Sequence, residues 1–422
     1  MASFRSFISI LLIFELTAAF SPLLLSTRRF TCIFSLPSWA DLESAIGHEE
    51  PPCLSIDSVL RPDKPNFSSE RPTLFRERHG WCPYSERVWL ALELNNVDYD
   101  TIRIDNSGGG RPSYYTGQTP QVRWPDGRTQ GESMDLVAEV DKRYGPRLQM
   151  DSGDVQHAIN QFRNIFPNRA RPSSRAAFLF QGNGDPLWKS TFEDTLLETD
   201  KLLGQNDGPF LCGSDLTAAD VAWAPFLERY RYQLPCLHLG LKPCHAETYP
   251  RLYKWYQAMD KVPEYVCRVK GDASSWRKVL TMAGFGNGGV PPQIGSNMDD
   301  LVKQEADNAA SIIDQDVWKQ YAATRPHVAE TPQAEAGAII IKNRSAIMKD
   351  ILKRTEKWGS GLPTTEDEVD AAMRGLAQLL MEGTVEADGA VRAVAVFLDE
   401  RMCVPRDMGA MSAASIKQLA CS

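Results

Sequence analysis

The chain has 422 residues, of which 43% are hydrophobic and 24% charged, and its formal net charge is −8. This length allows two or three domains, and the negative charge argues against nucleic-acid binding, which requires clustered Lys and Arg. Beyond the N-terminus no apolar run is long enough to cross a bilayer, so we expect no membrane span in the mature chain.

Nine cysteines are scattered along the chain, and none forms a Cys-x-x-Cys pair. In a chain of this length the pattern does not indicate a disulfide framework. Most of these cysteines are expected to be small buried hydrophobic residues, which favours a reducing compartment.

Residues 1–45 have the pattern of a targeting leader. Arg5 precedes a short apolar run, and Ala18-Ala19 offers a small-residue cleavage site, as in a signal peptide. An acid-poor stretch with Ser, Thr and Arg follows Phe20, as in a transit peptide. Together they resemble the bipartite plastid leader of algae with complex plastids, and we expect delivery to the chloroplast stroma. A plain secreted protein is the alternative.

Composition divides the rest of the chain into five parts. Residues 46–70 are rich in Pro and Ser and predict a linker. Residues 71–146 show the order βαβ, a connection and then ββα, which predicts a compact α/β domain. Residues 147–282 have almost entirely helical patterns. A Gly- and Pro-rich linker over 283–299 then leads to a helical extension, residues 300–422, whose role the sequence does not indicate.

The periodicity of apolar residues predicts individual helices and strands within these parts. In chain order they are a strand at 73–75, a helix at 84–95, strands at 99–104 and 121–124, and helices at 133–144, 188–203, from Thr217 onward, 249–259, 339–353, 366–381 and 391–402.

The strongest chemical signal is Cys82, which follows a predicted strand and precedes Pro83. Proline suits the first turn of a helix, so the sulfur is expected to face free N–H groups that stabilise a thiolate. Ser85 stands where a dithiol redox protein has its second cysteine, which allows a mixed disulfide with an outside thiol but no internal one. A structural cysteine beside a helix-starting proline is the alternative.

At these residues the chain resembles the cysteine-type glutathione transferases, namely the dehydroascorbate reductase, lambda and omega classes, and the related chloride intracellular channel proteins. The resemblance covers about residues 72–280. It implies a thioredoxin-like α/β domain followed by an all-helical transferase domain. It also implies glutathione as co-substrate, a small electrophilic or oxidised second substrate, no metal, and Cys82 as the catalytic residue. The oligomeric state stays open, a homodimer included.

Two further motifs complete the expected glutathione site. The Thr119-Pro120 bond is expected to be cis, and by resemblance the backbone of Thr119 binds the cysteinyl part of glutathione. Ser133, at the start of a helix, can bind the γ-glutamyl carboxylate, and Glu132 can pair with the ammonium group. An ordinary trans proline and a plain helix cap are the alternatives.

Several other residues are assigned structural roles. Thr217 and Asp220 match a capping box at the start of a core helix. Two cysteines and two histidines lie within residues 236–245, but their spacing is not that of a common zinc finger, and we expect a loop with buried cysteines. Arg87 is expected to form a surface salt bridge, with support of the helix end or of the site as alternatives. The turn over residues 401–409 is expected to cap a helical bundle, with covering of the substrate cleft as the alternative.

These patterns predict a glutathione-dependent thiol transferase or reductase that acts by deglutathionylation or dehydroascorbate-type reduction. The alternative is a non-catalytic glutathione-binding or protein-interaction module with the same fold.

The leader gives the first prediction. Residues 1–45 fused to a fluorescent protein should enter the plastid of an algal host with complex plastids, because the signal-like run leads into an acid-poor segment. Fluorescence in the growth medium instead would show a plain secretory signal.

Overall fold

The structure is a computed structural model that describes residues 36–47, 49, 53–106, 111–167, 178–281, 313–358, 361–383 and 387–421. The signal-like and transit-like stretches of the leader and the linker over residues 283–299 lie outside these ranges. Residues 37–422 form one compact unit, to which the following description applies.

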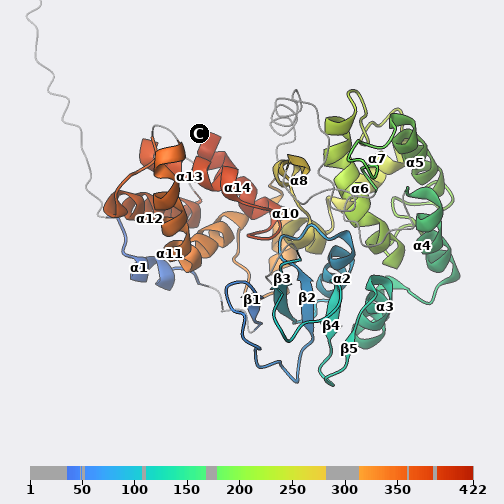
Figure 1. Cartoon of the computed structure of the whole chain (residues 1–422), viewed down its shortest axis with the longest axis horizontal. Helices are drawn as coiled ribbons and strands as arrows, with labels where there is room; N and C mark the ends of the chain where they lie inside the picture. The colour runs from blue at the N-terminus through green and yellow to red at the C-terminus, as the bar shows by residue number, and fades with distance from the viewer. Residues whose placement is uncertain are drawn as a thin grey trace, which may run out of the picture. The chain divides into compact units, whose positions relative to one another are not determined.

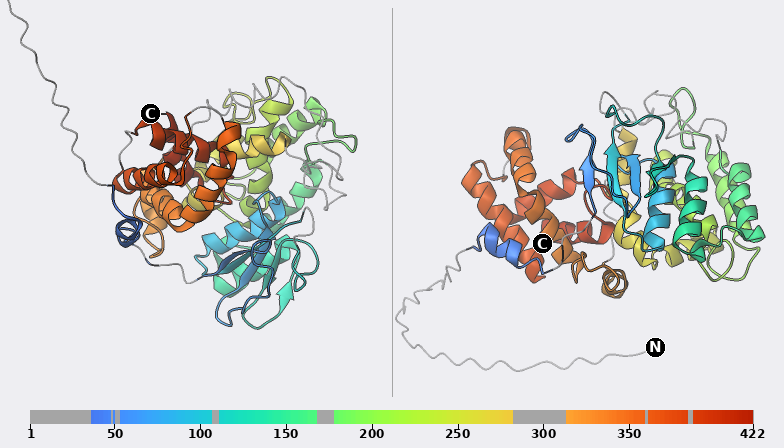
Figure 2. Two further views of the ribbon diagram at one scale, coloured as in Figure 1. Left: turned by 60° about the vertical axis from the view of Figure 1, so that its left-hand side comes forward. Right: turned by 90° about the horizontal axis from the view of Figure 1, so that it is seen from below.

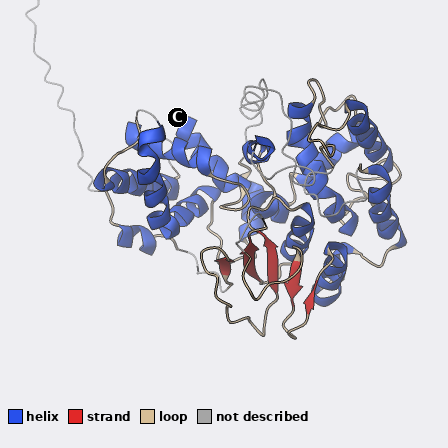
Figure 3. Cartoon of the chain, viewed as in Figure 1, coloured by secondary structure: helices blue, strands red, loops and turns tan. Residues whose placement is uncertain are grey.

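A five-stranded mixed sheet forms the first layer of the α/β domain (Figures 1 and 3). The strand order is β1-β3-β2-β4-β5, with β1, β3 and β2 parallel and β4 and β5 antiparallel to their neighbours. This arrangement is thioredoxin-like, as expected. The strands are β1 (Ser55–Asp57), β2 (Thr73–Glu77), β3 (Asp100–Ile104), β4 (Gln121–Arg123) and β5 (Thr129–Gln130).

Strand β1 lies within the predicted linker over residues 46–70. Ile56 pairs in register with Ile102 of β3, and both side chains are buried in an apolar cluster with Phe75 and Tyr115. A strand of three residues among prolines and serines is too short to show periodicity, so only its sheet partner reveals it.

Helix α2 (Pro83–Leu94) lies beside the sheet and packs against α3 (Ser133–Tyr144) and against the irregular helix η2 (Tyr265–Val269). Every residue of α2 except Tyr84 is buried, because the helix packs against α3, α6 and η2 as well as against β2. Helix α2 is therefore the central element of the transferase-like part of the chain.

The helical domain follows, as the sequence predicts. Thr217 and Asp220 form a capping box at the start of α6. The Asp220 carboxylate also accepts hydrogen bonds from the Leu211 backbone N–H and from Trp255 Nε1, so it joins three segments of the core. The helices are α4 (Gly153–Ile165), α5 (Lys189–Leu202), α6 (Ala218–Leu237), α7 (Pro250–Met259) and α8 (Ala273–Thr281).

The C-terminal helices surround a hydrophobic core of their own, and Figure 2 shows α11–α14 gathered into a bundle. Their bounds are α10 (Gln315–Ala322), α11 (Pro332–Trp358), α12 (Glu366–Glu382), α13 (Gly389–Arg401) and α14 (Ala410–Cys421). No helix in the described ranges is long and apolar enough to cross a bilayer.

A short helix that precedes the sheet also belongs to this bundle. Helix α1 (Trp39–Ser44) lies inside the predicted leader, yet Trp39 Nε1 donates to Asp370 of α12 at 2.7 Å, and Arg344 of α11 pairs with Glu43. Folded structure therefore begins at α1, within the last residues of the predicted leader. The sequence missed this helix because its partners lie some three hundred residues away.

The bundle and the transferase-like part meet at η2. A small apolar cluster joins η2 to α10 and α14, and it consists of Val266, Cys267, Val317, Trp318, Tyr321 and Met411. Directly before α14, the backbone of Gly409 approaches the Cys267 carbonyl so closely that no side chain fits between them.

Gly409→Ala should therefore destabilise this junction. Its added Cβ would lie 1.8 Å from the Cys267 carbonyl oxygen, so the backbone must shift, and overpacking of this kind costs about 1–3 kcal/mol. The measurement is the melting temperature. Gly389→Ala, at the start of α13, is the matched control because its Cβ would meet no atom within 4 Å. Equal melting temperatures for the two variants would contradict the contact.

A buried hydrogen bond between Arg229 and Glu86 joins α6 to α2. Glu86 Oε2 accepts a hydrogen bond from Arg229 at 2.7 Å, and both side chains are almost fully buried. Burial raises the pKa of Glu86 to about 8; Arg229 lowers it in part, and the neighbouring Glu228 raises it further. The folded state therefore favours the protonated form of Glu86.

This shift predicts how stability depends on pH. The contribution of Glu86 is fully present below its ordinary pKa of 4.5 and is lost as pH rises toward about 8, because the folded chain holds the proton longer than the unfolded chain. Glu86→Gln should therefore flatten the fall in melting temperature between about pH 5 and pH 8. Glu139→Gln is the control: Arg143 lowers the pKa of Glu139, so its contribution changes only at lower pH. An unaltered slope in Glu86→Gln would refute the assignment.

Candidate functional site

Cys82 lies between β2 and α2 as the N-cap residue of the helix, with Pro83 in the first turn. Its backbone is extended, its side chain makes no capping hydrogen bond, and 7% of the residue is exposed. The thiol is directed at the Thr119 carbonyl oxygen, 3.7 Å from Sγ. The structure thus brings Cys82 and Thr119 together at the positive end of α2.

The bond between Thr119 and Pro120 is cis. The Thr119 hydroxyl accepts a hydrogen bond from Asn106 at 2.8 Å, and Asn106 in turn accepts one from Arg111 at 2.8 Å. Gln121, whose polarity in a strand was unexpected, donates to the Thr116 carbonyl and so holds the segment before the proline. The sequence alone did not indicate Asn106 or Arg111, because no local pattern distinguishes them from ordinary loop residues.

Glu132 and Ser133 lie at the start of α3. Glu132 is exposed and has a positive φ of 61°, a backbone conformation that is uncommon for residues other than glycine. Ser133 is buried, and its hydroxyl oxygen accepts a hydrogen bond from the Arg87 guanidinium at 3.4 Å. The free N–H groups of the α3 N-terminus lie beside this hydroxyl.

The predicted surface salt bridge of Arg87 is wrong. Arg87 is buried, its Nε donates to the Ala222 carbonyl at 2.8 Å, and its guanidinium lies over the rings of Phe162 and Phe226. Burial lowers the pKa of Arg87 to about 10, still well above neutrality. The error has a physical cause: α2 is buried on nearly all sides, so no surface position was open to this residue.

Ser85 lies one turn after Cys82 and is 2% exposed. Its hydroxyl has no hydrogen-bond partner in the part of the chain that the structure describes. The residue thus fills the position of a second cysteine with a group that cannot form a disulfide.

The segment between β2 and Cys82 is fixed by its own hydrogen bonds. The two carboxylate oxygens of Glu77 accept from the backbone N–H groups of His79 and Trp81, at 3.0 and 2.8 Å. Arg229 of α6, the partner of Glu86, donates to the Trp81 carbonyl at 3.1 Å. The residue directly before Cys82 is therefore held by both the sheet and the helical domain.

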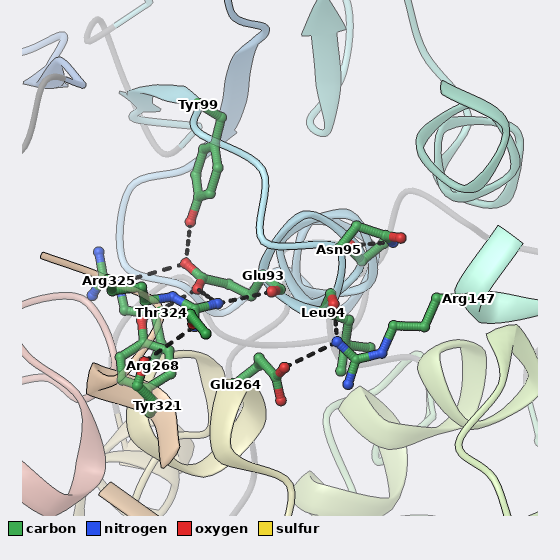
Figure 4. A network of polar contacts seen from close by, with 11 residues as sticks. Glu93, Leu94, Asn95, Tyr99, Arg147, Glu264, Arg268, Tyr321, Thr324 and Arg325 are labelled. Atoms are coloured by element: carbon green, nitrogen blue, oxygen red, sulfur yellow. Dashed lines mark hydrogen bonds and ion pairs between the residues drawn. The ribbon is translucent and has the colours of Figure 1, made fainter. Parts of the chain in front are cut away.

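The far end of α2 carries a second polar network, drawn in Figure 4. The Glu93 carboxylate accepts from the Tyr99 hydroxyl at 2.6 Å and from the Tyr321 hydroxyl of α10 at 3.2 Å. Arg325 donates to both the carboxylate and the backbone carbonyl of Glu93, and Arg268 lies 4.0 Å away. The C-terminal helices thus reach the helix that carries Cys82.

The turn over residues 401–409 does more than cap the bundle, contrary to the expectation. Cys403 Sγ donates to the His79 carbonyl at 3.7 Å, and Arg406 contacts the His79 ring at 2.9 Å. It therefore contacts the segment that leads into Cys82. Covering of the substrate cleft was the alternative role predicted for this turn. No local sequence signal could have decided between that role and capping of the bundle.

The cysteines and histidines within residues 236–245 have separate partners. Cys236 donates to a carbonyl in its own helix, His238 contacts the Leu187 carbonyl, and His245 contacts Thr248. Across the described ranges no three metal-binding side chains gather at one point. A surface groove of about 690 Å³ between α4 and α5, lined in part by His157, contains none of the predicted site residues.

Two stretches of the chain match known domain families. Residues 81–143 match the model of the glutathione S-transferase N-terminal domain, and residues 160–258 match that of the C-terminal domain. Among solved structures, dehydroascorbate reductase from Chlamydomonas reinhardtii is 20% identical with a TM-score of 0.34, covering 47% of this chain and 92% of the other. Glutathione transferase Omega 1C from Trametes versicolor is 18% identical with a TM-score of 0.38, covering 57% and 97%.

Several similar proteins come from plants. Protein IN2-1 homolog B of Oryza sativa subsp. indica is 28% identical over 199 residues, 44% of this chain and 75% of the relative. Glutathione S-transferase L3 of Arabidopsis thaliana is 26% identical over 190 residues, 44% and 77% respectively. Glutathione S-transferase DHAR2 of the same plant is 26% identical over 152 residues, 35% and 66%. The chain therefore contains the N-terminal and C-terminal domains of the glutathione S-transferase family, followed by a helical extension outside both.

Proposed function

We propose that this chain is a glutathione-dependent thiol transferase or reductase in which Cys82 is the nucleophile. The observation that carries the proposal is the position of the Cys82 sulfur, at the N-cap of α2 and 3.7 Å from the carbonyl oxygen of Thr119. The free N–H groups of a helix start stabilise a thiolate, which is the reactive form of cysteine. The similarity to glutathione S-transferase L3 and glutathione S-transferase DHAR2 of Arabidopsis thaliana supports the same class of function.

Glutathione would bind along the edge formed by the cis-proline segment and the start of α3. The backbone of Thr119 would bind its cysteinyl part, and Ser133 its γ-glutamyl carboxylate. Arg87 supports this role for Ser133: its N–H donates to the Ser133 oxygen, so the hydroxyl hydrogen remains available for an anion. The exposed carboxylate of Glu132 would pair with the ammonium group.

The reaction proceeds through a mixed disulfide. The Cys82 thiolate attacks the glutathione sulfur of a glutathionylated substrate, forms a Cys82–glutathione disulfide and releases the substrate as its thiolate. The thiolate of a second glutathione then attacks this disulfide, which yields oxidised glutathione and restores Cys82. Ser85 cannot resolve the intermediate, so the second thiol must come from glutathione.

The low exposure of Cys82 favours a second candidate, a non-catalytic glutathione-binding or interaction module. With 7% of the residue exposed, a bulky substrate would need some movement of the surrounding loops. The two candidates differ in one requirement, because only the enzyme needs a reactive Cys82.

Cys82→Ser should lower glutathione-dependent disulfide reduction by roughly a thousandfold or more, because a hydroxyl cannot form the mixed disulfide. The measurement is the reduction of a small glutathione mixed disulfide with reduced glutathione as the electron donor. Mass spectrometry after treatment with oxidised glutathione should show an adduct on the Cys82 peptide of the native chain. Ser85→Ala is the control and should keep most of the activity, since Ser85 forms no covalent bond.

Full activity in Cys82→Ser would overturn the mechanism. Binding alone is followed by the rise in melting temperature that millimolar glutathione causes through preferential binding to the folded chain. Ser133→Ala should reduce this rise, whereas Ser152→Ala, at the start of α4, should not. A glutathione-dependent rise without any Cys82 chemistry would leave the binding module as the better reading, and no rise at all would contradict a glutathione site.

A further inference from the structure

Residues His79–Trp81 directly precede Cys82. They are contacted by residues Cys403–Asp407 of the extension, which we call the 403–407 turn. Pro405 lies against Gly80, with its ring 3.5 Å from where a Cβ would stand. Gly80 has a φ of +80°, a backbone conformation that favours glycine, and at 3.5 Å the proline ring makes ordinary van der Waals contact there. The turn and the segment thus fit together along their backbones.

The 403–407 turn is itself firmly held. The Cys403 backbone N–H donates to the Asp407 carboxylate at 2.9 Å, and Asp407 pairs with Arg406 through two hydrogen bonds of 2.7 and 2.8 Å. The Val404 N–H donates to Ser275 of α8 at 2.8 Å. A guanidinium fixed in this way has a defined direction, and its remaining N–H groups point to a defined partner.

That partner is the ring of His79. Arg406 Nη1 lies 2.9 Å from His79 Nδ1, and because a guanidinium can only donate, Nδ1 must be the unprotonated nitrogen. Burial lowers the pKa of His79, with Glu77 opposing the shift and Arg406, the nearest cation, adding to it, so the ring is neutral at physiological pH. Arg78 and Asp105 also face this ring, with opposite effects on its charge.

The contact reaches Cys82 through a stack of two rings. The His79 ring lies parallel to Trp81, with centroids 4.4 Å apart and an interplanar angle of 21°. Trp81 is the residue before the thiol, and its backbone is already fixed by Glu77 and Arg229. Cys403 adds a second link to the His79 carbonyl, and burial raises the pKa of its thiol to about 11, so it remains a protonated donor.

We propose that Arg406 is a positioning residue for Cys82, which acts through His79 and Trp81 to hold the thiol at the start of α2. Without this contact the 79–81 segment keeps only its Cys403 and Pro405 contacts with the extension, and the sulfur is held less firmly at the start of α2, where a thiolate is favoured. The extension would thereby be part of the working site. The proposal rests on the proposed reactivity of Cys82.

The test is the alkylation rate of Cys82 in the full-length chain, followed by mass spectrometry of its peptide with iodoacetamide as the neutral reagent. Arg406→Ala should slow alkylation roughly tenfold near pH 7 and leave it nearly unchanged near pH 10, where an ordinary exposed cysteine is mostly ionised. Arg406→Lys, which keeps a donor for Nδ1, should recover much of the rate. Arg401→Ala, which removes only an ion pair with Asp350, is the control and should behave as the native chain.

A second variant leaves every residue of the extension unchanged, so its effect on alkylation does not depend on how the extension folds. His79→Phe keeps a ring to stack on Trp81 but has no acceptor for Arg406, and it should reproduce the loss near pH 7. Native rates in both Arg406→Ala and His79→Phe would overturn the proposal, as would an equal slowing at both pH values, which would indicate access to the thiol rather than its ionisation.

Glutathione turnover separates this proposal from the proposed function. Suppose that turnover requires Cys82, and that Arg406→Ala changes neither turnover nor the alkylation rate of Cys82. The positioning role would then be refuted, and the proposed enzyme function would stand. Suppose instead that the native chain shows no turnover, but that Arg406→Ala still slows alkylation of Cys82 near pH 7. The proposed function would then be refuted, and the positioning role would stand.

Discussion

The burial of α2 on nearly all sides is the constraint on which the rest of the structure depends. A buried helix can carry ionisable side chains only where each finds a partner, because an unpaired charge away from water is strongly unfavourable. Glu86 meets Arg229, Arg87 meets a backbone carbonyl and Ser133, and Glu93 meets tyrosines and Arg325. These three positions fix α2 to the helical domain, to the start of α3 and to the C-terminal extension.

The same constraint explains the position of the thiol. Cys82 begins a helix that cannot slide or turn without breaking one of these buried contacts. The segment before it is tied to Glu77 on the inside and to the 403–407 turn on the outside. In the proposed enzyme, a thiol held between these two supports would need little reorganisation when a substrate binds.

Local features were predicted well from the sequence. Two helix starts were predicted from residues that are close along the chain. They are marked by Cys82 before Pro83 and by the capping box of Thr217 and Asp220. The two-domain transferase fold follows from such local patterns taken together, and the family matches agree with it.

What escaped prediction depends on partners far away in the sequence. Strand β1 is recognisable only once β3 lies beside it, and α1 only with α11 and α12 in place. The environment of Arg87 depends on Ala222, and the turn around Arg406 on a histidine 327 residues earlier. The spacing of residues along the chain does not indicate such contacts. The contact of the 403–407 turn with the segment before Cys82 is therefore seen only in the three-dimensional structure.

The Glu93 network has a consequence for synthesis of the chain. Its partners Tyr321 and Arg325 follow it by 228 and 232 residues, so both transferase domains leave the ribosome well before the groups that complete the end of α2. During that interval the carboxylate has Tyr99 and Arg268 from the domains already made, and it stays open to water on the side that α10 later covers. Until α10 is made, the Glu93 carboxylate therefore lacks two of the partners that complete the end of α2 in the folded chain.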